Sequence, residues 1–110
     1  MAMSTTLLDN VELIKNINLI KESSTVKDFH KLYYEASHTW NLNKYRGFPI
    51  LKFCTDLWQY QELITIIRPN LIIECGTAFG GSALYFSDLQ KTNNIKPSKI
   101  VTIDVEAYKN

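Results

Sequence analysis

The chain has 110 residues, of which 45% are hydrophobic and 21% charged, and its formal net charge is +1. This length suits one modest domain, and the composition is ordinary for a globular protein. The basic residues are spread along the sequence, which argues against a nucleic-acid-binding surface. We therefore predict no nucleic-acid partner.

No apolar run reaches the roughly 18 residues that a membrane span needs. Asp9 and Glu12 also interrupt the N-terminal segment that would form the apolar part of a signal sequence. We expect a cytoplasmic protein with no membrane partner. Cys54 and Cys75 occur without a Cys-x-x-Cys pair or a histidine at ligand spacing, which predicts free, buried thiols and no metal site.

Residues 1–40 are predicted to form an N-terminal helical segment of two helices. Helical spacing of apolar residues from Leu7 to Ile20 marks the first helix, with Asp9 or Asn10 as its cap. Thr25 and Asp28 have the spacing of a capping box at the start of the second helix. Its inward face would carry Val26, Phe29, Tyr33, Ala36 and Trp40, and the off-face residues His30 and His38 are expected at the surface.

Residues 41–55 show no sustained period and predict a loop or short irregular segment, in which Arg46 is expected at the surface. A third helix is predicted between a cap at Thr55 or Asp56 and a stop at Pro69–Asn70. Its apolar residues, expected in the core, are Leu57, Trp58, Tyr60, Ile64 and Ile67.

A strand, a glycine-rich turn and a helix follow. Leu71–Ile73 is apolar throughout, which is typical of a parallel strand covered on both faces. The chain then turns through three glycines and is predicted to enter a helix at Gly81 or Ser82. Residues 100–103 predict a second strand that ends at Asp104. The fold class is therefore α/β, with one β-α-β unit after the N-terminal helices.

Three kinds of ligand compete for a glycine turn after a strand. A Walker phosphate-binding loop requires a lysine directly after its second glycine, but here Gly76 runs to Gly81 and Ser82 follows, so we set that loop aside. The dinucleotide fingerprint requires a glycine where Ala78 occurs, which weakens an NAD-type site but leaves it as an alternative. The third pattern, E-x-G-x-x-x-G-x-S, fits at Glu74, Gly76, Gly80 and Ser82. It resembles the first motif of class I S-adenosylmethionine methyltransferases, in the form seen in catechol O-methyltransferase-like enzymes.

A wider resemblance covers about residues 40–106. Arg46-Gly-Phe-Pro, followed by Arg68-Pro-Asn-Leu-Ile-Ile-Glu-Cys-Gly-Thr-Ala-Phe-Gly-Gly-Ser, resembles the cephalosporin hydroxylase / rhamnosyl O-methyltransferase family. The resemblance implies that residues 41–110 begin a Rossmann-like S-adenosylmethionine-binding domain. It also implies methylation of a hydroxyl on a sugar or small natural product, with a divalent metal in some members. The expected cofactor-binding residues are Glu74, Gly76, Thr77, Gly80, Gly81, Ser82 and Asp104.

The family sheet has seven strands, and the chain ends after the second, so the fold is expected to be incomplete. The metal ligands and the general base of such enzymes lie in later strands, and we assign no catalytic residue here. Two alternatives stay open beside the methyltransferase. One is a non-catalytic remnant that pairs with a partner chain or a second copy through an exposed sheet edge, and the other is an NAD-type fragment. For Ser82, a plain helix N-cap is an equal alternative to cofactor binding.

Overall fold

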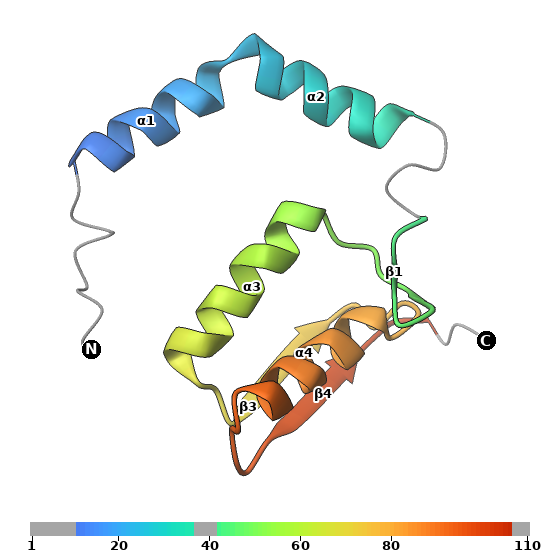
Figure 1. Cartoon of the computed structure of the whole chain (residues 1–110). Helices are drawn as coiled ribbons and strands as arrows, with labels where there is room; N and C mark the ends of the chain where they lie inside the picture. The colour runs from blue at the N-terminus through green and yellow to red at the C-terminus, as the bar shows by residue number, and fades with distance from the viewer. Residues whose placement is uncertain (1–10, 37–41, 107–110) are drawn as a thin grey trace. The chain divides into compact units, whose positions relative to one another are not determined.

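The computed structural model of the chain describes residues 11–36 and 42–106. It divides into two compact units, Met1–Ser37 and His38–Asn110. The elements, drawn in Figure 1, are α1 (Val11–Glu22), α2 (Ser24–Glu35), β1 (Lys44–Tyr45), β2 (Phe48–Pro49), α3 (Cys54–Ile67), β3 (Leu71–Cys75), α4 (Gly81–Thr92) and β4 (Lys99–Ile103). None of the described helices is long and apolar enough to cross a membrane.

The first unit contains the two predicted N-terminal helices, α1 and α2, separated by Ser23. The proposed cap at Asp9 or Asn10 lies outside the described residues, as do His38 and Trp40. The capping box at Thr25 is wrong, because α2 begins at Ser24 and Thr25 lies inside the helix. Its N-cap is Ser23, which makes no side-chain capping hydrogen bond.

The predicted inward face of α2 is not buried. No described residue of this helix is buried, and the Phe29 side chain is 53% exposed, although Val26, Tyr33 and Ala36 are half-buried. The helical period was correct, but two adjacent helices do not supply enough surface to enclose a stripe of large side chains.

The second unit begins with a short β-hairpin where an irregular segment was predicted. Strands β1 and β2 are antiparallel, with Tyr45 opposite Phe48. The two connecting residues, Arg46 and Gly47, have φ angles of 49° and 87°. Two-residue hairpin turns favour positive φ at such positions, and Arg-Gly is not one of the usual Asn-Gly or Asp-Gly signals.

Helix α3 ends before Pro69 as predicted, but it starts at a different residue. Its N-cap is Phe53, so neither Thr55 nor Asp56 begins the helix. At the C-terminus, Arg68 adopts a left-handed conformation, and its N–H donates to the Ile64 carbonyl. Trp58 was expected in the core but is 68% exposed.

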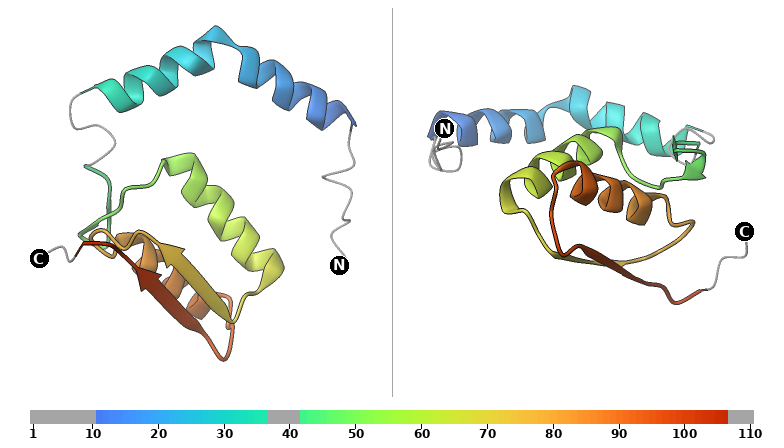
Figure 2. Two further views of the ribbon diagram at one scale, coloured as in Figure 1. Left: turned by 180° about the vertical axis from the view of Figure 1, so that it is seen from behind. Right: turned by 60° about the horizontal axis from the view of Figure 1, so that its bottom comes forward.

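The β-α-β unit is confirmed as a parallel pair of strands connected through α4. In the register, Ile72 lies opposite Ile100 and Glu74 opposite Thr102. Helices α3 and α4 lie on the same side of the two strands, as Figure 2 shows. The core between these layers is formed by Ile64, Phe86 and Ile95.

The opposite face of the sheet is open in the described residues. Leu71, Ile73 and Ile103 are 49%, 60% and 57% exposed. The prediction of a strand covered on both faces is therefore wrong for this chain, because helices cover one face only. Cys54 and Cys75 are free thiols, as predicted, but both are exposed and not buried.

Candidate functional site

The glycine turn between β3 and α4 has a conformation that requires its glycines. Gly76 and Gly80 have φ angles of 97° and 79°, where residues with a Cβ are strained. The Gly76 N–H donates to the Ile103 carbonyl at 2.7 Å, and the Gly80 N–H donates to the Thr77 carbonyl at 2.8 Å. A Cβ built on either glycine would meet no atom within 4 Å. Open space therefore borders the backbone of the turn.

Asp104 is attached to this turn through its carboxylate. Its Oδ2 accepts a hydrogen bond of 2.8 Å from the Ala78 N–H, and its Oδ1 accepts one of 3.2 Å from the Glu106 N–H. Both hydrogen bonds lower the pKa of the Asp104 carboxyl below its usual value, and the bond from Ala78 has the larger effect. Next to it, the hydroxyls of Thr77 and Thr102 are hydrogen-bonded to each other. Each carboxylate oxygen has a second lone pair for a further donor.

Glu74 is buried at the end of β3, with only 6% of its surface exposed. Its Oε1 accepts a hydrogen bond of 2.5 Å from the Ser82 hydroxyl and lies 3.6 Å from the Lys52 ammonium. Its Oε2 is buried and has no hydrogen-bond partner among the described residues. Burying an acceptor without a donor costs about 1–3 kcal/mol, so this oxygen favours an additional donor.

Ser82 does not act as the N-cap that was its alternative role. The N-cap of α4 is Gly80, and Ser82 is the second residue of the helix. Its hydroxyl is used instead to connect the helix to Glu74.

Lys52 is the site residue that sequence reasoning missed. It lies between the hairpin and α3, and its side chain is 29% exposed beside Glu74. A lysine in an irregular segment carries no local signal of an ion pair with a strand more than twenty residues away. The available clue was that a buried carboxylate is generally paired with a cation or hydrogen-bonded.

Gly81 has a packing role in the structure. A Cβ at this position would lie 2.2 Å from the Pro49 carbonyl oxygen and 3.1 Å from the Ile50 Cβ. Only glycine lets the hairpin approach the first turn of α4 this closely. This contact accounts for the second glycine of the pair without any ligand.

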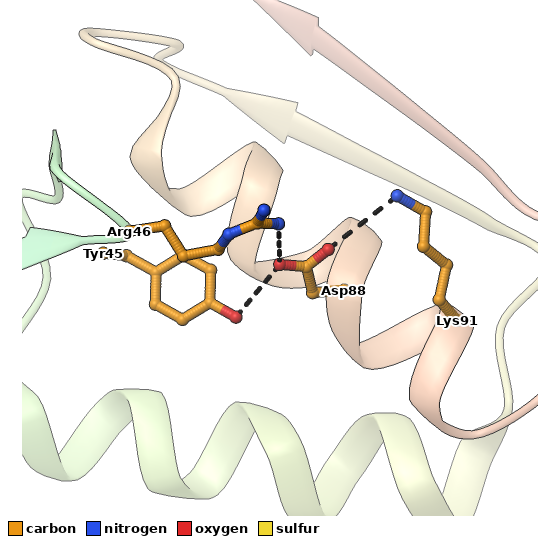
Figure 3. Close-up of polar contacts among 4 residues, drawn as sticks. All are labelled: Tyr45, Arg46, Asp88 and Lys91. Carbon is orange, nitrogen blue, oxygen red and sulfur yellow. Dashed lines mark hydrogen bonds and ion pairs between the residues drawn. The ribbon is translucent and has the colours of Figure 1, made fainter.

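A polar cluster attaches the hairpin to α4 at a second point (Figure 3). Tyr45 and Arg46 both donate to Asp88 Oδ2, at 3.1 Å and 2.9 Å, and Lys91 lies 3.8 Å from Oδ1. The hydrogen bond from Arg46 is the main cause that lowers the pKa of Asp88. Arg46 is at the surface as predicted, with 61% of its side chain exposed.

The structure thus places the predicted residues in two groups. Ser82 contacts Glu74 beneath α4, and Asp104 contacts the turn that contains Gly76, Thr77 and Gly80. A cavity of about 360 Å³ borders Glu74, but its lining does not include Asp104. The two carboxylates therefore do not share this cavity. The described residues contain no group of three or more side chains suited to hold a metal ion.

Comparison of the sequence with known proteins places the chain in a family. A sequence model of the family described as Rhamnosyl O-methyltransferase/CmcI matches residues 37–110. A rhamnosyl O-methyltransferase of Mycobacterium leprae (strain TN) is 37% identical over 82 residues, which are 74% of this chain and 35% of that protein. Those of Mycobacterium tuberculosis (strain ATCC 25618 / H37Rv) and Mycobacterium bovis (strain BCG / Pasteur 1173P2) are each 36% identical over 81 residues, which are 74% of this chain and 32% of theirs.

No solved structure matches the chain. The chain spans about a third of the length of the curated relatives that it matches. The match nevertheless covers most of this chain, including β3, the glycine turn, α4 and β4. The chain belongs to the Rhamnosyl O-methyltransferase/CmcI family.

Proposed function

We propose that this chain supplies the S-adenosylmethionine-binding part of an O-methyltransferase that acts on a hydroxyl of a sugar or another small molecule. Family membership supports O-methyl transfer, and the names of the relatives support a sugar acceptor. The parallel β3-α4-β4 unit supports a Rossmann-like domain. The observation that carries the cofactor assignment is the Asp104 carboxylate, held against the glycine turn by the Ala78 N–H at 2.8 Å.

The residues present fit this cofactor at the turn. Gly76 and Gly80 border open space, where a ligand can approach the backbone of the turn. Asp104 would accept the ribose hydroxyls with its remaining lone pairs, as an acid does in the related dinucleotide fold. Thr77 would help to hold the turn through its bond to Thr102. When bound, the cofactor supplies an activated methyl group, and the turn and Asp104 orient it.

The proposed role of Glu74 is separate from that of the turn, because Glu74 borders a cavity whose lining does not include Asp104. Its buried Oε2, which has no hydrogen-bond partner among the described residues, would accept a hydrogen bond from the cofactor ammonium through a water or after a shift of the side chain. Ser82 positions the carboxylate from α4, and Gly81 keeps that helix close to the hairpin. We assign no metal ligand and no general base to the described residues, and we propose a cytoplasmic site of action.

A titration by calorimetry with S-adenosylhomocysteine and NAD, side by side, tests the proposal. We expect measurable heat with S-adenosylhomocysteine and none with NAD. S-adenosylhomocysteine is the suitable probe because it has the carboxylate, ammonium and ribose of the cofactor without the reactive methyl. Tighter binding of NAD would instead favour the dinucleotide-type alternative and overturn the assignment.

A further inference from the structure

The glycine turn between β3 and α4 uses backbone donors of its own within the chain. The N–H groups of Gly76, Ala78 and Gly80 each donate to an acceptor inside the chain, at 2.7, 2.8 and 2.8 Å. Two of these acceptors are backbone carbonyls, and the third, which binds Ala78, is the Asp104 carboxylate. A turn that binds a phosphate directs such N–H groups at the ligand instead. These three donors are therefore not available to an anionic ligand.

The first turn of α4 also faces oxygen atoms of the chain itself. The hairpin backbone lies so close to Gly81 that a Cβ there would be 2.2 Å from the Pro49 carbonyl oxygen. The Ser82 hydroxyl donates to the Glu74 carboxylate at 2.5 Å. Oxygen atoms with full or partial negative charge complement the positive N-terminal end of a helix. Here the chain supplies these oxygens, so the helix end offers little attraction to a further anion.

Asp104 places a negative charge directly at the turn. In the part of the chain that the structure describes, the ion pairs involve Asp88 and Glu74 but not Asp104. The Asp104 carboxylate is held by backbone N–H groups, and the bond from Ala78 contributes most to lowering the pKa of its carboxyl. The carboxylate is therefore ionised at neutral pH, and a phosphate bound against the turn would be repelled by it.

We propose that Asp104 determines which nucleosides the turn accepts, by excluding those that carry a phosphate against it. This inference deepens the proposed function and rests on it for the identity of the ligand. S-adenosylmethionine suits such a turn, because it has no phosphate and its sulfonium leaves it with a net positive charge. ADP and NAD carry negative charge on the pyrophosphate, the group that a dinucleotide-binding turn holds with its N–H groups. The carboxylate that would accept ribose hydroxyls thus rejects other nucleotides.

Titrations with adenosine and ADP, followed by the amide chemical shifts of Gly76, Thr77 and Gly80, test the proposal. We expect the parent to bind adenosine at least about tenfold more tightly than ADP. Asp104→Asn should bind ADP at least about tenfold more tightly than the parent does, because the repelling charge is lost. Glu106→Gln is the matched control, since it removes the same charge from an exposed side chain two residues away and should leave ADP binding unchanged. Equal or undetectable ADP binding by the parent and Asp104→Asn would overturn the proposal.

A second variant separates the charge of Asp104 from the side chain of Ala78. Ala78 occupies the position of the second glycine in the dinucleotide fingerprint, so its Cβ is the other candidate barrier to a phosphate. Its φ angle of 45° suits glycine, so Ala78→Gly should fold. We expect this variant to exclude ADP as the parent does. Binding of ADP by Ala78→Gly and not by Asp104→Asn would show that the Cβ is the barrier and overturn the proposal.

S-adenosylhomocysteine, titrated under the same conditions, distinguishes failure of this inference from failure of the proposed function. A parent that responds to neither S-adenosylhomocysteine nor adenosine would overturn the proposed function and this inference with it. A parent that binds S-adenosylhomocysteine, and binds ADP as tightly as adenosine, would overturn only the exclusion of phosphate by Asp104.

Discussion

The Ser82 hydroxyl donates a hydrogen bond of 2.5 Å to Glu74 Oε1, which connects the first turn of α4 to the end of β3. Lys52 approaches the same oxygen from the segment before α3. Three separate elements therefore meet at one buried carboxylate. The motif from Glu74 to Ser82 is continuous in sequence, but in the structure its first residue also contacts Lys52, which lies outside the motif.

Ser82→Ala should destabilise the chain. The substitution removes the hydrogen bond that Ser82 donates to Glu74 and leaves the carboxylate, within the described residues, with the Lys52 ion pair alone, at a cost of about 1–3 kcal/mol. Urea unfolding followed by circular dichroism measures this free energy. Ser87→Ala, on the same helix, is the control and should change stability by less than about 0.5 kcal/mol. Equal effects at the two positions would refute a special role for Ser82.

Lys52→Met should also destabilise the chain, because it leaves the buried Glu74 carboxylate without its cation. The methionine keeps the apolar part of the lysine side chain, so the loss reports on the charge. Lys52→Arg should recover part of the stability. Thermal unfolding of the three proteins compares them, and a Met variant as stable as the parent would contradict the pairing.

Gly81→Ala should lower the free energy of unfolding, although the same substitution usually raises it in a helix. Alanine in a helix is normally favoured over glycine by up to about 1 kcal/mol. Here the new Cβ would lie 2.2 Å from the Pro49 carbonyl oxygen, so we expect destabilisation by about 1–3 kcal/mol. The same urea titration measures it. An increase in stability would show that the hairpin does not pack against the start of α4.

The contribution of Asp88 to stability, through the hydrogen bonds that it accepts from Tyr45 and Arg46 of the hairpin, should decrease at acidic pH. Its pKa is lowered in the folded chain, first by the hydrogen bond from Arg46. A carboxyl with a depressed pKa stabilises the fold above its unfolded pKa of about 4, and this contribution is lost as the pH falls through the folded pKa. The stability difference between the parent and Asp88→Asn should therefore be largest near neutral pH and shrink in acid. A difference that stays constant between about pH 7 and pH 3 would contradict this account.

The local pattern of the sequence predicted the β3-α4-β4 unit but not what surrounds it. The apolar strand, the glycines and the second strand are short-range signals, and each element was found where expected. Helix starts were displaced at Ser23 and Phe53, because residues without a capping side-chain hydrogen bond occupy both N-caps. The exposure of Trp58 and Ile73 depends on which surfaces have neighbours, and periodicity does not contain that information.

For the candidate site as well, local sequence patterns were predictable, and contacts between distant residues were not. Glycine positions and strand-end acids can be recognised from spacing, so Gly76 and Asp104 were predicted as site residues, and their cofactor role stays a prediction. The contacts of Lys52 with Glu74 and of Gly81 with Pro49 join residues distant in sequence, and no local pattern encodes them. Packing against Pro49 is an alternative to the predicted cofactor role of Gly81. The stability of the Gly81→Ala variant measures the contribution of this packing.

Amide chemical shifts during a titration with S-adenosylhomocysteine test most directly whether the glycine turn and Asp104 bind S-adenosylmethionine. We predict saturable shifts at Gly76, Thr77 and Gly80, weakened by Asp104→Asn and unchanged by the control Asp56→Asn on the exposed first turn of α3. Unchanged shifts at the turn, or equal binding by the parent and Asp104→Asn, would contradict this binding.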